Sequence, residues 1–190
     1  LQKSGMAEQI QAYAASGGTI FGICGGFQML GQRISDPEGI EGEAGDHPAL
    51  NLIPLHTAMT TNKIARQRQV TSKLPQAGLP VDGYEIHQGR SRLMHIKGKD
   101  PNAEYLPIFD APGLGLVDES RSIWGCYLHG LFDNGPWRRS WLNYLRKQRG
   151  LPSLPTGIAN YREQREAALS SVADLVEVHL NLTPILPNNY

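Results

Sequence analysis

Residues 19–31 read Thr-Ile-Phe-Gly-Ile-Cys-Gly-Gly-Phe-Gln-Met-Leu-Gly. Residues 19–23 are short and apolar, which is typical of a buried strand. Cys24 follows in a glycine-rich turn, and the apolar spacing after it predicts a helix over residues 27–34. A strand, a tight turn and a helix in this order form the elbow on which some hydrolases hold their nucleophile. The pattern therefore predicts that Cys24 is a nucleophile.

The glycines around Cys24 have separate expected roles. A side chain at Gly22 or Gly26 is expected to collide where the strand and the helix cross. The positive end of the helix is expected to lower the pKa of the thiol, and the Gly25 N–H to bind the oxyanion of a tetrahedral intermediate. The alternative is a small buried cysteine at the start of a packed helix. The complete strand–turn–helix order favours the nucleophile.

Apolar periodicity in the remaining chain indicates helices mixed with strands. The expected helices span residues 6–15, 133–150 and 161–180, and the expected strands span residues 52–55, 70–74, 83–88 and 122–128, with a hairpin in residues 106–117. The polar residues 35–51 are expected to be loop, and residues 57–69 a polar connection. This mixture predicts an α/β fold with one open, mainly parallel sheet flanked by helices, and with antiparallel additions in the middle.

Each of the last two expected helices carries an apolar stripe that is expected to face the core. In the first of them the stripe consists of Trp137, Trp141, Tyr144 and Leu145. In the second it consists of Ala168, Leu169, Val172, Leu175, Val176 and His179. His179 is accordingly interpreted as a hydrogen-bonded core histidine.

The composition excludes several classes of protein. Among 190 residues, 18 are Lys or Arg and 18 are Asp or Glu. This balance argues against a nucleic-acid or anionic-membrane partner, and no apolar run is long enough to span a bilayer. Two cysteines, Cys24 and Cys126, are too few for a disulfide scaffold and lack zinc-site spacing. No metal is expected, and a reducing, cytoplasmic location is favoured.

A thiol that attacks an amide needs a base, and the chain has six histidines to supply it. His47, His56 and His95 lie in polar segments and are interpreted as generic. His129 ends an apolar strand just before Gly130, which places it at the carboxyl edge of the sheet, where Cys24 is also expected. A structural strand-end histidine is the alternative. Cys126 lies within that strand and is interpreted as a small core residue.

Three separated motifs resemble class I glutamine amidotransferases, in their cobalamin-pathway branch. The first is residues 21–31, Phe-Gly-Ile-Cys-Gly-Gly-Phe-Gln-Met-Leu-Gly. The second is residues 83–90, Gly-Tyr-Glu-Ile-His-Gln-Gly-Arg, and the third is residues 127–134, Tyr-Leu-His-Gly-Leu-Phe-Asp-Asn. Residues 36–42 and the C-terminal helix also fit. The resemblance covers most of the chain and implies a flavodoxin-like fold.

The resemblance implies that the domain hydrolyses L-glutamine. By position, Cys24 matches the nucleophile, His129 the catalytic histidine and Gln28 a glutamine-binding residue, with Gly25 and Gly26 beside them. The ammonia then passes to a separate synthetase domain, where ATP and Mg²⁺ are expected and where corrinoid carboxylates are amidated. No cofactor is expected in residues 1–190 themselves.

The sequence departs from the family in two places. Most class I members carry Glu two residues after the histidine, but Leu131 stands here, so what orients His129 stays open. Glu85 and His87 share one face of a strand and are candidates, although a structural or substrate-facing role fits them equally. The chain also begins at Leu1 without the strand and glycine-rich loop that normally open this domain. We expect a single amidotransferase domain that lacks its first strand or strands, as a fragment of a longer polypeptide.

Three readings of the function stay open. The motifs around Phe27 and Leu131 favour amidation of a corrinoid a,c-diamide. The related reactions that form this diamide, or that amidate a cell-wall lipid precursor, are alternatives within the amidotransferases. A non-catalytic remnant is the alternative from another class.

Overall fold

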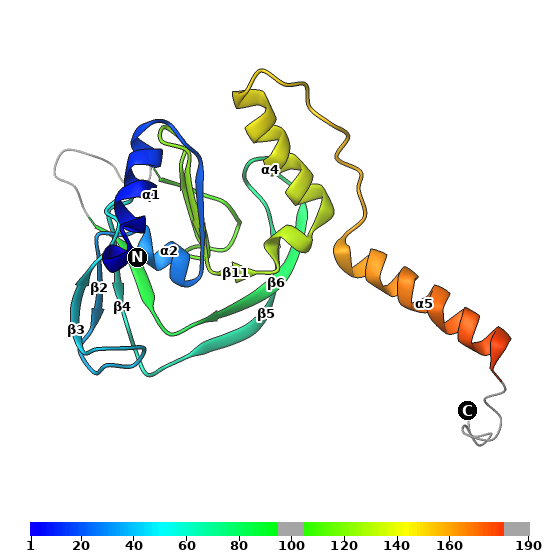
Figure 1. Cartoon of the computed structure of the whole chain (residues 1–190), viewed down its shortest axis with the longest axis horizontal. Coiled ribbons are helices and arrows are strands. Elements are labelled where there is room, and N and C mark those ends of the chain that lie inside the picture. The colour runs from blue at the N-terminus through cyan, green and yellow to red at the C-terminus, as the bar shows by residue number, and fades with distance from the viewer. Residues whose placement is uncertain (95–104, 181–190) are drawn as a thin grey trace.

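The chain combines helices near its two ends with a long run of strands between them, which confirms the α/β class (Figure 1). The computed structural model describes residues 1–94 and 105–180. Its helical segments are η1 (Gln2–Ser4), α1 (Met6–Ala15), α2 (Gly25–Met29), η2 (Leu131–Asp133), α4 (Gly135–Gln148) and α5 (Tyr161–His179). Its strands are β1 (Ile20–Ile23), β2 (Arg33–Asp36), β3 (Gly45–Pro48), β4 (Leu55–Ala58), β5 (Ile64–Thr71), β6 (Pro80–His87), β7 (Arg90–Leu93), β8 (Tyr105–Pro107), β9 (Gly115–Asp118), β10 (Ile123–Cys126) and β11 (Leu128–His129).

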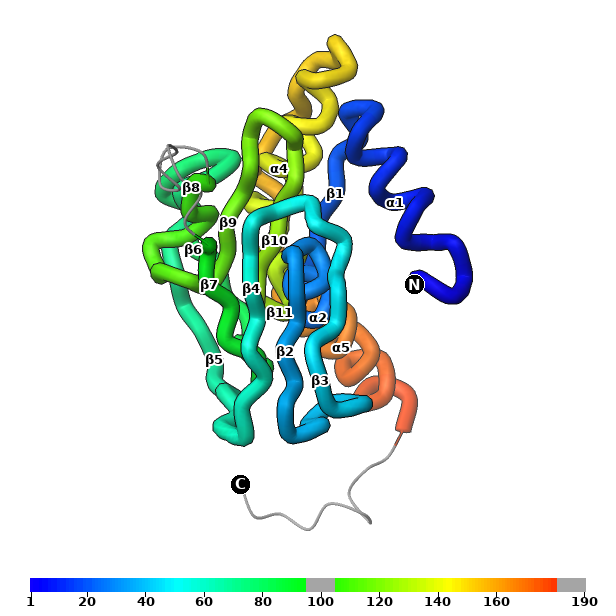
Figure 2. The backbone as a smooth tube through the Cα atoms, turned by 90° about the vertical axis from the view of Figure 1, so that its left-hand side faces the viewer, coloured from blue at the N-terminus to red at the C-terminus, as the bar shows by residue number. Residues whose placement is uncertain are grey.

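The described strands form three sheets, with the orders β1–β10–β9–β8, β3–β2–β4–β7 and β11–β6–β5. Figure 2 shows β3, β2 and β4 side by side, with α1 next to β1. Among the described strands, β1 pairs with β10 and β2 with β4 in parallel, and the other neighbours are antiparallel. The sheets are therefore less parallel than expected, because hairpins join several neighbouring strands.

The chain changes sheets at Tyr127. The strand expected over residues 122–128 is in fact two strands, β10 and β11, which belong to different sheets. β10 lies beside β1, with Cys126 opposite Ile23. Its continuation, β11, pairs with β6 instead. This change of partner carries His129 away from the sheet that holds β1 and onto β6.

The helix after Cys24 is shorter than its apolar spacing predicts. α2 ends at Met29, because the next residues bond to a distant part of the chain. The Leu30 carbonyl accepts the N–H groups of Leu52 (2.9 Å) and Ile53 (3.0 Å). The Gln32 N–H donates to the Leu55 carbonyl at 2.8 Å. These long-range bonds occupy the backbone groups that another helical turn would need.

Two polar segments contain strands that were not expected. β2 and β3 extend into residues 35–51, β5 starts within residues 57–69, and the strand expected over residues 52–55 begins only at Leu55. β3 and most of β5 are exposed or half-buried. Antiparallel strands with a solvated face can carry polar side chains, so their composition resembles that of a loop. The hairpin expected in residues 106–117 is confirmed by the β8–β9 pairing.

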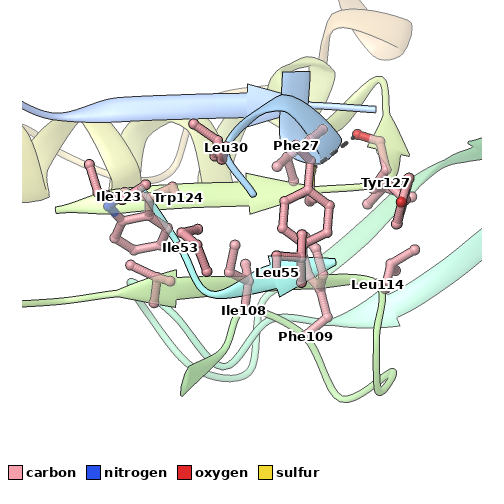
Figure 3. Close-up of a cluster of buried hydrophobic side chains, with 14 of the residues drawn as sticks. Phe27, Leu30, Ile53, Leu55, Ile108, Phe109, Leu114, Ile123, Trp124 and Tyr127 are labelled. Carbon is pink, nitrogen blue, oxygen red and sulfur yellow. Dashed lines mark hydrogen bonds between the residues drawn. The ribbon is translucent and has the colours of Figure 1, made fainter. Parts of the chain in front are cut away.

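The core forms between the sheets around Phe27, the first large side chain after the Cys24 turn. Figure 3 shows Phe27 of α2 and Leu30, which follows α2, next to buried side chains from β10 and from residues 108–114. Phe27 is 2% exposed and Trp124 is fully buried. Trp137 of α4 is also fully buried, as its stripe predicts. The packing of Phe27 anchors the turn that precedes it.

Helix α5 does not carry its apolar stripe into the core. Leu169, Val172 and Leu175 are 56%, 57% and 60% exposed, and His179 is exposed as well. Figure 1 shows the helix extending away from the sheets. The expectation of a core-facing stripe is therefore wrong, because helical spacing reveals an apolar face without specifying what covers it. Among the helices in the described ranges, none is both long enough and apolar enough to cross a membrane.

β1 and α2 cross at Gly22. A Cβ atom there would lie 2.6 Å from the Gly26 carbonyl oxygen and 2.8 Å from the Phe27 amide nitrogen. This confirms that no side chain fits at Gly22. At Gly26 no heavy atom lies within 4 Å of such a Cβ, so the collision expected there is wrong. The Gly26 carbonyl faces the strand, whereas its Cα faces open space.

Gly22→Ala is expected to lower the free energy of unfolding by roughly 1–3 kcal/mol, because backbone of the Cys24 turn must move. Gly26→Ala is the matched control and is expected to change it by less than about 1 kcal/mol. Urea unfolding of both variants measures the difference. Equal destabilisation, or an unaffected Gly22→Ala variant, would contradict the tight crossing.

Candidate active site

Cys24 has a strained backbone. Its φ of 54° and ψ of −114° lie in a region that residues other than glycine rarely adopt, at a cost of about 1–3 kcal/mol. Two hydrogen bonds hold this conformation: the Cys24 N–H donates to the Cys126 carbonyl at 2.8 Å, and the Gln28 N–H donates to the Cys24 carbonyl at 3.1 Å. The strand, strained cysteine and helix confirm the elbow geometry. Such strain persists where the surroundings impose it, as nucleophile elbows do.

The Cys24 thiol is half-buried and donates a hydrogen bond to the Ile86 carbonyl at 3.3 Å. Burial raises its pKa above the ordinary value of 9.0, and the carboxylate of Glu41 adds to this, while the Gly25 N–H opposes it. The helix start does lower the pKa through the Gly25 N–H, but burial outweighs this, so the expected net lowering is wrong. α2 has only five residues, and its contribution is smaller than the loss of hydration. The resting group is a thiol, so its attack requires a base.

His129 and the Cys24 thiol both contact strand β6. In β11 it pairs with Tyr84 of β6, two residues from the Ile86 carbonyl that the thiol contacts. These two anchor points are roughly 7 Å apart along the strand, at about 3.4 Å per residue. The His129 Nε2 atom is buried and has no hydrogen-bond partner within the described ranges. This leaves Nε2 open to a hydrogen bond with a group that comes within reach.

Asn134, in the third motif, fixes the turn that follows His129. Its side-chain amide donates to the carbonyls of Asp82, Gly130 and Leu131 at 2.8, 3.1 and 3.0 Å, and its Oδ1 accepts the Asp82 N–H at 2.9 Å. The sequence placed Asn134 in the third motif and at the start of the helix predicted over residues 133–150, but it did not predict these contacts. A buried amide that bonds both the turn and β6 keeps the end of β11 in register with β6.

Glu85 and His87 are brought together, but not with His129. The Glu85 carboxylate accepts from His87 Nε2 at 3.1 Å and pairs with Arg66 and Arg68, both at 2.8 Å. His87 Nδ1 donates to the Gly89 carbonyl at 2.6 Å. In the β6–β11 register Glu85 is opposite Leu128, so it occupies the face of β6 opposite to that of Tyr84 and His129.

The Glu85 carboxylate is held in its charged form. Burial alone raises its pKa, but hydrogen bonds from Arg66 and His87 and the charge of Arg68 together lower it below the ordinary value of 4.5. His87 also stacks on Tyr127, with ring centroids 3.7 Å apart. This buried cluster stabilises β6, the strand that both Cys24 and His129 contact.

Gln28 has a buried side chain that is fixed from two sides. The Tyr127 hydroxyl forms hydrogen bonds with Gln28 and with Ser91. Gly89 lies against the Gln28 amide so closely that any side chain at Gly89 would collide with it. The side-chain amide of Gln28 is therefore held in one place.

A pocket of about 120 Å³ opens at Cys24. Among the described residues it is lined by Cys24, Gly25, Gln28, Glu41, Lys63, Ile86, His87 and Gln88. Cys24, Gly25 and Gln28 thus come together as expected, whereas Gly26 and His129 are not in this lining. Glu41 and Lys63 were not expected at the site, because single charged residues in polar segments give no sequence signal.

A larger cavity of about 320 Å³ lies on the far side of Phe27 and is lined mainly by apolar side chains from β7, β8 and β9 and their connections. None of the predicted site residues lines it. The larger volume favours this cavity as a binding site, but the strained Cys24 and the fixed Gln28 amide favour the smaller pocket. Among the described residues, no three His, Cys, Asp or Glu side chains meet in a metal-binding group.

Residues 1–137 match the CobB/CobQ-like glutamine amidotransferase domain family. The chain belongs to this family. Similar curated proteins include the cobyric acid synthases of Nostoc punctiforme, 68% identical over 186 residues, and of a Nostoc species, 65% identical over 187 residues. The cobyric acid synthase of Synechocystis is 56% identical over 186 residues. Each match covers 98% of this chain but only 36–37% of the relative, so this amidotransferase chain spans just over a third of their length.

Glu85→Gln is expected to reduce the loss of stability on acidification. The folded state keeps the carboxyl deprotonated to a lower pH than the unfolded state does. The stability that Glu85 contributes is therefore present above about pH 4.5 and is lost as the pH falls through its folded pKa. Urea unfolding from about pH 6 to about pH 3 should give a steeper decline for the wild type than for the variant.

Glu38→Gln is the matched control, because Glu38 is exposed. It should follow the wild-type pH dependence. Identical slopes for the wild type and Glu85→Gln would contradict the lowered pKa of Glu85.

Proposed function

We propose that this chain is the glutaminase part of a cobyric acid synthase. It releases ammonia from L-glutamine for the amidation of carboxylates on adenosylcobyrinic acid a,c-diamide. The observation that carries the proposal is the strained Cys24 at the end of β1, opening into a pocket that also holds the fixed Gln28 amide. The family match supports the use of glutamine, and the name shared by the similar proteins supports the acceptor.

In this reaction His129 takes the proton of the Cys24 thiol, and the sulfur attacks the side-chain carbonyl carbon of glutamine. The Gly25 N–H stabilises the oxyanion that forms. His129 then gives the proton to the leaving nitrogen, the C–N bond breaks, ammonia departs, and a thioester remains on Cys24. Water activated by His129 hydrolyses the thioester to glutamate, and the thiol is restored.

The raised pKa of the Cys24 thiol affects the step at which the thiol loses its proton. Burial keeps Cys24 protonated in the resting site, so the proton transfers during attack instead of before substrate arrives. Leu131 stands where related enzymes carry a glutamate, and it is buried in the core at 1% exposure. Cys24 and His129 therefore act as a dyad, with the backbone contacts of Asn134 keeping the end of β11 in place.

The acceptor reaction takes place outside this chain in our proposal. A synthetase region binds ATP, Mg²⁺ and the corrinoid, activates a carboxylate and receives the ammonia. The similar proteins are nearly three times as long as the part that this chain matches, which leaves room in them for such a region.

In a synthase that contains this chain, Cys24→Ala is expected to abolish glutamine-dependent amidation of the corrinoid. Addition of ammonium salt should restore amidation, because only the ammonia source is lost. His129→Ala should lower glutamine hydrolysis by roughly 100- to 10 000-fold, the usual contribution of a general acid–base. Ammonia release and corrinoid amidation are measured in parallel.

Cys126→Ala is the matched control. Its thiol is fully buried in β10, where burial raises the pKa to about 12, so it should not act as a nucleophile. The variant should retain most of the hydrolysis. Full activity of Cys24→Ala or of His129→Ala would contradict the proposal.

A further inference from the structure

The Cys24 pocket carries one acidic and one basic side chain, Glu41 and Lys63, that the hydrolysis reaction does not use. Both residues are exposed. Among the described residues, neither side chain forms an ion pair or a hydrogen bond within the chain. Their charges are therefore available to a ligand in the pocket. His87, the other titratable side chain there apart from Cys24, already bonds Glu85 and Gly89 through its two ring nitrogens.

The backbone at Glu41 is fixed by Asp36, in the motif of residues 36–42. Asp36 is 4% exposed, and its carboxylate accepts the N–H groups of Ile40 at 2.8 Å and Glu41 at 2.9 Å. These bonds also hold the pKa of Asp36 below its ordinary value. The conformation of this loop is thus built around a buried carboxylate, and it directs Glu41 to the pocket.

The backbone next to Lys63 is fixed by a separate set of hydrogen bonds. The Arg90 guanidinium donates to the Asn62 carbonyl at 2.7 Å, and the Thr60 hydroxyl donates to the Gln88 carbonyl at 2.9 Å. Gln88 itself lines the pocket. The segment before β5 is therefore tied to the turn between β6 and β7, and Lys63 is held at the pocket.

We propose that Glu41 and Lys63 bind the two charges of the free amino acid glutamine, Glu41 the α-ammonium and Lys63 the α-carboxylate. The proposal rests on the glutaminase function. A substrate with its side-chain amide at Cys24 and Gln28 presents both charged groups at the opposite end. One acid and one base on separate elements match this zwitterion. They would reject a peptide-bound glutamine, whose α-groups are uncharged amides.

The position of Glu41 also links substrate binding to the nucleophile. Its charge is one of the causes that raise the pKa of the Cys24 thiol, together with burial. An α-ammonium paired with Glu41 cancels this charge. The groups around Cys24 that carry or can gain charge are Glu41, Lys63 and His87 in the pocket, Cys126 and Tyr127 on the β10 side, and His129 of β11. Binding of glutamine would therefore remove the contribution of Glu41 to the raised pKa and favour the thiolate once substrate is present.

The test compares glutamine with two analogues that each lack one charge. Glutaramate lacks the α-ammonium, and 4-aminobutanamide lacks the α-carboxylate. The wild type should hydrolyse glutamine with a kcat/KM at least roughly tenfold above either analogue, as expected for loss of one charged contact. Glu41→Gln should lose the preference for glutamine over glutaramate, and Lys63→Met should lose the preference for glutamine over 4-aminobutanamide. In both variants KM for glutamine should change more than kcat.

Glu38→Gln and Lys147→Met are matched controls, because both residues are exposed and do not line the pocket. They should retain wild-type selectivity. Wild-type selectivity in Glu41→Gln and Lys63→Met, or an equal loss of hydrolysis of all three amides, would contradict the proposed binding of the α-charges by Glu41 and Lys63. With either result the glutaminase function would stand. If the wild type does not hydrolyse glutamine, the function itself fails.

Discussion

The parallel pairing of β1 with β10 controls where the two candidate catalytic side chains, Cys24 and His129, lie. Ile23 is opposite Cys126, so Cys24 leaves the sheet at the same edge as the segment that leads to His129. The Cys24 N–H then bonds the Cys126 carbonyl, which helps to hold the strained turn. β6 completes the arrangement, because its Ile86 carbonyl meets the thiol while its Tyr84 pairs with His129. A slip of one residue in either pairing would turn one of the two side chains to the other face of its sheet.

Burial affects the chemical state of the candidate site. The thiol pKa is raised, and the Nε2 atom of His129 is buried without a partner in the part of the chain that the structure describes. The Nε2 atom is thus open to a hydrogen bond from a bound substrate or from the thiol. Under the proposed function, glutamine supplies the missing charge at Glu41 and the electrophile at Cys24 together. The site is then reactive toward its own substrate and less reactive toward other electrophiles.

Local patterns predicted the elbow, the α/β class and the buried Cys126, because each depends on neighbours in sequence. The length of α2 could not be predicted, since its end depends on hydrogen bonds to residues 52–55. The place of α5 could not be predicted either, because an apolar stripe does not identify its partner. Glu85 and His87 share a face of β6, as the alternation indicated, but only the register with β11 shows that His129 lies on the other face. Asn134, Glu41 and Lys63 became visible only through tertiary contacts.

We propose that Cys24 is a nucleophile in a site that binds glutamine, and covalent labelling with a glutamine analogue tests this proposal. The folded protein is treated with a thiol-reactive glutamine analogue, and the modified cysteine is identified by mass spectrometry. We predict one label per chain, on Cys24 and not on the fully buried Cys126, and protection by excess L-glutamine but not by L-glutamate amide isomers such as isoglutamine. Labelling of Cys126, or a Cys24 that does not react in the folded protein, would contradict it.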